Sequence, residues 1–146
     1  MTEIKIGKRT IPLFYSTYEM IAIQEEIGCT AFQLREEVAG FHQDDPDDPM
    51  TIHLDVVNDP GKIKKLGKLL KILGNAGLEE AGEEPDLTEK WILRNMKPAL
   101  IMAYALAALK EIVEGNKLEL PAEAAEKQGP VDEVLEEENA KKQPGN

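Results

Sequence analysis

The sequence predicts an α+β fold that is mainly helical, with an N-terminal β-hairpin packed on a small bundle of about five helices. Three observations predict it: polar and apolar residues alternate over residues 3–14, helix-start signals precede several apolar stripes, and the composition changes after Gly115. We expect residues 1–115 to form the hairpin-plus-helical-bundle domain. Residues 116–146 have no aromatic residue and carry an acidic run, so we expect a disordered acidic tail.

The hairpin is predicted from the alternation on both sides of Gly7. Residues Gly7 and Lys8 fit a two-residue turn of type II′, which takes glycine at its first central position. A hairpin of this size is not stable alone, so it must lie on the helices that follow.

The first helix is expected over residues 17–27. Ser16 and Glu19 form a capping-box pattern, and Gly28 is placed to end the helix. The expected apolar stripe consists of Met20, Ile23 and Ile27.

A second helix is expected after another capping-box pattern, Thr30 with Gln33. Its stripe would be Leu34, Val38 and Phe41, with Gly40 near its end. The aspartates and prolines of residues 44–49 then predict an irregular acidic loop, and residues 51–57 alternate as a short extended segment does.

The third helix begins at the Asp59–Pro60 signal and is expected to stop near Gly74 and Asn75. Its apolar face would hold Ile63, Leu66, Leu70 and Leu73. Thr88 is predicted to cap a fourth helix, with Leu87 and Ile92 forming a hydrophobic staple, and Pro98 ends or kinks that helix.

The last helix, residues 99–114, is apolar around most of its circumference. One stripe consists of Ile101, Ala105, Ala108 and Ile112, and another of Met102, Leu106, Leu109 and Val113. Such a helix lies at the centre of a bundle or between subunits.

Charge and composition exclude several functions. The net charge of −11 repels a phosphate backbone, so we expect no nucleic-acid partner. The longest apolar run has 12 residues, against about 20 for a bilayer span, so we expect a soluble chain that does not bind membranes. The single cysteine cannot form an internal disulfide, and no N-terminal signal pattern is visible.

Candidate chemical residues are few. His42 and His53 flank the acidic loop, but their order matches neither an EF-hand nor a His-Glu-x-x-His motif, so we expect a solvated loop with no metal and no cofactor. Cys29 and Trp91 are interpreted as structural. No catalytic motif is present, and we expect a protein that is not an enzyme.

The third helix contains a ten-residue stretch with five lysines: Lys62, Lys64, Lys65, Lys68 and Lys71. This lysine row is either an ordinary solvated face or a docking face for an acidic partner, such as the chain's own tail or another subunit. Lys64, Lys68 and Lys71 are our candidate partner-binding lysines.

Several short segments resemble tail assembly chaperones of long-tailed bacteriophages, over about residues 1–116. The matching pieces are Lys5–Lys8, Ile11–Leu13, Tyr18–Glu19, Ile23–Gly28, Leu69–Leu78, Trp91–Leu93, Lys97–Pro98 and the apolar helix that ends at Gly115. The resemblance implies a small, acidic, non-enzymatic protein of the host cytoplasm. It would bind the tape-measure protein, keep it soluble until the tail tube polymerises, and be absent from the mature virion.

The implied partners are the tape-measure protein and the tail-tube protein, and self-association is left open. The candidate contact residues are Ile101, Met102, Ala105, Leu106 and Leu109. The simpler interpretation is that most of them belong to the core. The alternative function is a small structural or adaptor protein of a phage particle or host complex that acts through helix–helix contacts. A metal protein or enzyme built on His42 and His53 ranks third.

Overall fold

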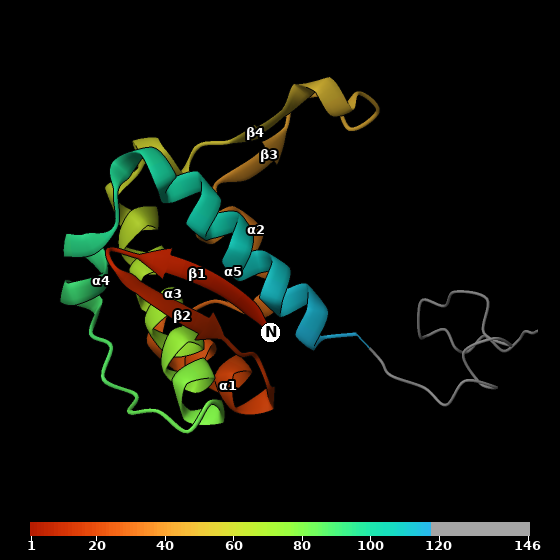
Figure 1. Cartoon of the computed structure of the whole chain (residues 1–146). Coiled ribbons are helices and arrows are strands. Elements are labelled where there is room, and N and C mark those ends of the chain that lie inside the picture. Colours follow the sequence, from red (N-terminus) through yellow and green to blue (C-terminus); the bar gives the residue numbers. More distant parts are fainter. Residues whose placement is uncertain (118–146) are drawn as a thin grey trace, which may run out of the picture. The chain divides into compact units, whose positions relative to one another are not determined.

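The computed structural model describes residues 1–117, in which five α-helices and two antiparallel hairpins alternate with four short 3-10 helices (Figure 1). The mainly helical α+β fold is therefore confirmed. Residues Met1–Asn116 form one compact unit. The predicted acidic tail lies outside the described residues.

The N-terminal hairpin forms as predicted. Strands β1 (Thr2–Ile6) and β2 (Arg9–Leu13) pair with Ile4 opposite Ile11, and Gly7 takes φ 62°, the positive value that a primed two-residue turn requires. The apolar residues of both strands point to one face and are buried: Ile4, Ile6, Ile11 and Leu13. That face packs on the helices, which supplies the stability that a lone hairpin lacks.

Helix α1 (Thr17–Glu26) begins at the predicted capping box, in which Ser16 and Glu19 cap each other's backbone. The predicted stripe is partly wrong. Ile23 is fully buried, but Met20 is 40% exposed, and the residue buried one turn before Ile23 on the same face is Glu19. The capping role of Glu19 holds its side chain inward, where it accepts hydrogen bonds from Ser16.

The second helix is shorter than predicted. After the Thr30 cap the chain forms η1 (Ala31–Gln33) and a single turn, α2 (Leu34–Glu37), and Phe41 begins strand β3 (Phe41–Gln43) instead of completing a helical stripe. Strand β3 pairs with β4 (Ile52–Leu54), so the predicted extended segment is confirmed in part. Between them lie the irregular acidic loop and η2 (Pro49–Thr51). We call residues 41–54 the β3–β4 arm, and Figure 1 shows it extending away from the helices.

Helix α3 (Pro60–Glu80) follows η3 (Val56–Asn58) and is the central element. Asp59 caps it as predicted, but it continues well past the expected end at Gly74. Gly74 and Gly77 lie inside the helix, at positions where other parts of the chain pack closely against its backbone. A Cβ atom on Gly77 would lie 1.9 Å from the carbonyl oxygen of Pro12, so only glycine lets β2 approach this closely.

Helix α4 (Glu89–Asn95) is capped by Thr88 as predicted, and Leu87 and Ile92 are both buried. Trp91 is half-buried, with the Arg9 guanidinium 5.6 Å from its ring centre. The prediction of a break at Pro98 is confirmed, because Pro98 opens η4 (Pro98–Leu100), which leads into α5 (Ile101–Gly115). No helix among residues 1–117 is long and apolar enough to span a membrane.

Candidate functional site

Helix α5 is fixed to the hairpin by two polar contacts. The Tyr104 hydroxyl donates a 2.7 Å hydrogen bond to the carbonyl oxygen of Lys5, and the backbone N–H of Thr2 donates a 2.8 Å bond to Glu111. Tyr104 and Glu111 are each only 5% exposed, and burial raises the pKa of Tyr104, so its hydroxyl keeps its proton. These contacts lie on the inward side of α5 and fix that side to the hairpin.

The inward face of α5 is one of the two stripes identified in the sequence. Ile101, Ala105, Ala108 and Ile112 are all buried, and Ala105 and Ala108 are fully so. Two of the five candidate contact residues, Ile101 and Ala105, are therefore part of the core in this structure.

The outward face carries the other stripe: Met102, Leu106, Leu109 and Val113. We call these four residues the outward stripe. Leu106 is 48% exposed and Val113 is 59% exposed, while Met102 and Leu109 are half-buried and pack against the core. Val113 was not among our candidate residues, although its place in the second stripe was visible in the sequence.

The spacing of the outward stripe suits a helical partner. Its members follow one another at intervals of four, three and four residues, which is the repeat that lines up apolar side chains along a seam between two helices. The stripe can therefore accept the apolar face of an amphipathic helix, with Leu106 and Val113 as the side chains that have most area left to bury.

Most lysines of the row form ion pairs with carboxylates of the same chain. The ammonium group of Lys68 lies 3.1 Å from Glu89, and that of Lys71 lies 2.8 Å from Glu26. Lys65 pairs with Glu37 at 2.6 Å, and this hydrogen bond lowers the pKa of Glu37 and raises that of Lys65. Among residues 1–117, Lys64 is the member of the row without a carboxylate partner, and it is exposed.

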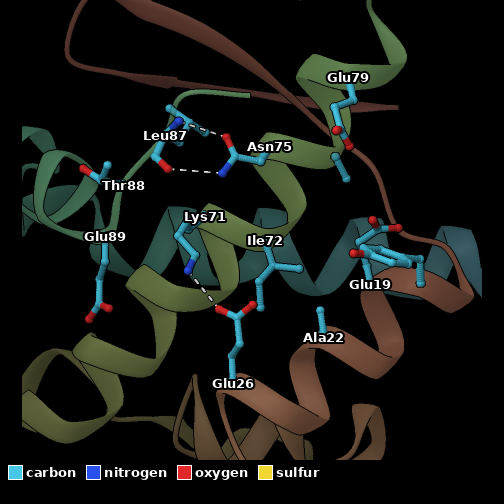
Figure 2. Close-up of a pocket in the computed structure, with 12 residues that line it drawn as sticks. Glu19, Ala22, Glu26, Lys71, Ile72, Asn75, Glu79, Leu87, Thr88 and Glu89 are labelled. Carbon is cyan, nitrogen blue, oxygen red and sulfur yellow. Dashed lines mark hydrogen bonds and ion pairs between the residues drawn. The ribbon is translucent and has the colours of Figure 1, made fainter. Parts of the chain in front are cut away.

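Figure 2 shows a groove between α1, α3 and the segment that leads into α4. The Lys71–Glu26 pair spans it, and the Asn75 side chain both donates to and accepts from the backbone of Leu87. Its principal polar groups thus bind each other and hold the helices together. The groove is thus a packing seam between these elements.

The two histidines and the acidic loop are brought together in the β3–β4 arm. His42 lies directly opposite His53 in the strand register, and their rings stack with centroids 4.9 Å apart. Asp44 lies beside both, with Oδ2 3.0 Å from Nε2 of His53. His53 lies nine positions after Asp44 and eleven after His42 in the sequence, and strand pairing makes it their neighbour.

Cys29 is buried, and burial raises the pKa of its thiol, with the Glu37 charge adding to the shift. A thiol that keeps its proton is a weak nucleophile, so the environment of Cys29 suits the structural interpretation.

Comparison with protein-family models, curated proteins and solved structures finds no match to this chain.

Proposed function

We propose that this chain is a non-enzymatic tail assembly chaperone that binds the long helical tape-measure protein of a bacteriophage and keeps it soluble until the tail tube polymerises. The observation that carries the proposal is the outward stripe, four apolar residues at helix-pairing intervals on a helix whose opposite face is buried. The resemblance of the short segments in residues 1–116 to that family supports the same function.

The energetics of the outward stripe suit a contact that must later be reversed. Fully burying a leucine stabilises a complex by about 1.5–3 kcal/mol, and the stripe is already partly covered by the chain itself. Association costs at least about 4 kcal/mol in lost translational and rotational freedom. One copy therefore binds weakly, and firm coating requires many copies along one long partner.

The charge of the chain suits a coating role. A net charge of −11 keeps neighbouring coated complexes apart and gives no attraction for nucleic acid. In this proposal the protein works in the host cytoplasm, contacts the tape-measure protein and in turn the tail-tube protein, and is left out of the mature virion.

The test is co-expression of the full chain with the tape-measure candidate encoded near it, followed by light scattering on a sizing column. The proposal predicts that the long protein becomes soluble and elutes with many copies of this chain. Precipitation of the long protein while this chain elutes free would contradict it. The chain expressed alone, run on the same column, gives its own oligomeric state as the reference.

The alternative adaptor function makes a different prediction for purified phage particles. A structural or adaptor protein is retained in stoichiometric amounts, whereas an assembly chaperone is absent or scarce. Quantitative mass spectrometry of purified virions separates the two functions. Stoichiometric retention would favour the adaptor.

A further inference from the structure

The β3–β4 arm carries a cluster of side chains that the proposed function does not use. His42 and His53 project from facing positions of the two strands on one side of the arm, with their rings inclined by 24°. They are the only two histidines in the sequence. Both side chains are about half exposed, so a small ligand can reach their ring nitrogens.

Asp44 joins the two rings through one carboxylate. Its Oδ2 lies 3.0 Å from Nε2 of His53, and its Oδ1 lies 3.9 Å from Nε2 of His42. Both Nε2 atoms therefore face the same group, and all three ligand atoms lie within 4.8 Å of one another.

We propose that His42, His53 and Asp44 form a binding site for a divalent transition-metal ion, with Zn²⁺ as the best-suited ion. A tetrahedral zinc site with ligand bonds of about 2.0–2.1 Å has ligand atoms about 3.3 Å apart. The three groups reach that spacing by small side-chain rotations, which their exposure allows. A water molecule completes the fourth position.

Asp55 supplies the outer contact that such a site needs. Its Oδ2 lies 3.8 Å from Nδ1 of His42, the ring nitrogen that faces away from the metal position, and a small rotation of these half-exposed side chains would bring the two atoms within hydrogen-bond distance. A carboxylate behind a histidine ligand fixes the proton on Nδ1, leaves Nε2 free to bind the metal and makes it more basic. The cluster thus places a carboxylate behind one of its three candidate ligands.

The ligand set selects among cations. Two imidazole nitrogens and one carboxylate suit Zn²⁺ and its transition-metal neighbours, whereas Ca²⁺ and Mg²⁺ prefer all-oxygen sites.

Metal binding at this site would have a structural consequence for the β3–β4 arm. Each strand of the arm has three residues, too few for a stable isolated hairpin, and a metal bound by both strands links them. The acidic loop and Met50, which is 88% exposed, would then be held in one position.

The test is a titration of the full, tag-free chain with Zn²⁺ against a chromophoric chelator. We expect one ion per chain. H53Q and D44N each remove a ligand, whereas D55N removes the outer contact. Loss of an outer-shell partner lowers metal affinity about 10- to 100-fold in comparable sites. We expect H53Q and D44N to weaken binding at least as much as D55N. NMR of the imidazole side chains should show both Nε2 signals shifting on addition of Zn²⁺.

The matched control is D47N, which removes the same charge from the same loop outside the cluster. It should leave Zn²⁺ affinity unchanged. Absence of binding would overturn the proposal, as would binding that survives H53Q. If D47N weakens binding as much as D44N, the acidic loop attracts cations diffusely and no defined site exists. Circular dichroism without metal shows that each variant is folded as the wild type is.

Discussion

The Tyr104 hydroxyl donates a hydrogen bond to the carbonyl oxygen of Lys5, 99 residues earlier in the chain, with an O···O distance of 2.7 Å. The bond joins the first turn of α5 to strand β1. It lies on the same side of the helix as buried Ile101 and Ala105, and it adds to the apolar packing that leaves Leu106 exposed in the contact surface we propose.

Replacing Tyr104 with Phe removes this hydrogen bond while keeping the ring. Loss of one neutral intramolecular bond should lower the free energy of unfolding by about 1 kcal/mol, because the Lys5 carbonyl is left unpaired. Urea denaturation measures the change. Y18F serves as the control, since Tyr18 is 77% exposed, and its stability should match the wild type. Equal stability of Y104F and Y18F would show that the bond does not hold α5.

Gly77 is predicted to be the glycine of α3 that least tolerates a side chain. An added methyl group meets backbone atoms of Pro12 at 1.9 and 2.4 Å, and backbone cannot move aside cheaply. G77A should cost ~3 kcal/mol or prevent folding.

G74A provides the comparison for G77A in the same helix. Its new methyl group meets the tip of the Leu87 side chain at 2.5 Å, which can rotate away, so the loss should be smaller. Thermal unfolding ranks the variants, and a smaller loss in G77A than in G74A would contradict the close approach of β2 to α3.

Asp59 makes stability depend on pH. Its carboxylate accepts hydrogen bonds from the backbone N–H groups of Lys62 and Gly61, and the bond from Lys62 is the largest cause of its lowered pKa. Because the folded-state pKa lies below the unfolded value, the stabilisation is present above the unfolded pKa. It is lost as the pH falls through the folded pKa.

Asparagine caps a helix without titrating, so D59N should lose less stability than the wild type between about pH 5 and pH 2. Denaturant midpoints over that range measure the slopes, and D47N controls for charge. Identical slopes in the wild type and D59N would be evidence against a role for the cap in acid sensitivity.

The lysine row gives a prediction that separates its two interpretations. If Lys71 serves mainly to hold α1 against α3, K71E should destabilise the fold modestly, and the double variant K71E/E26K should recover most of the loss. Pairs exposed to this extent contribute about 0.5 kcal/mol. A double-mutant cycle by urea denaturation measures the coupling. A coupling of zero would leave Lys71 available to an external partner.

Helix starts were predictable from the sequence because caps are local. Ser16, Asp59 and Thr88 each bond backbone groups two or three residues away, so the pattern and the contact coincide. The length of α3 was not predictable, because Gly77 is set by its contact with Pro12, 65 positions earlier. A local rule that treats glycine as a helix end fails where tertiary packing needs glycine inside the helix.

The candidate sites likewise combine features that are visible in the local sequence with features that depend on tertiary contacts. The two stripes of α5 were visible as periodicity, but which stripe points inward depends on tertiary contacts, including those of Tyr104 and Glu111 with β1. The His42–His53 pair depends on the register of β3 with β4, whereas the sequence pattern predicts a helix that includes neighbouring Phe41. No spacing rule could bring these histidines together without that pairing.

The most direct measurement of our central claim compares the wild type with L106Q/V113Q in co-expression with the long helical partner. The two substitutions make the exposed part of the outward stripe polar and leave the buried face of α5 intact. The matched control is F32Q/M50Q, which changes two residues that are 94% and 88% exposed on other elements. We predict that L106Q/V113Q folds with unchanged thermal stability but leaves the partner insoluble, whereas the control solubilises it as the wild type does. Full solubilisation of the partner by L106Q/V113Q would contradict the claim that α5 is the contact surface.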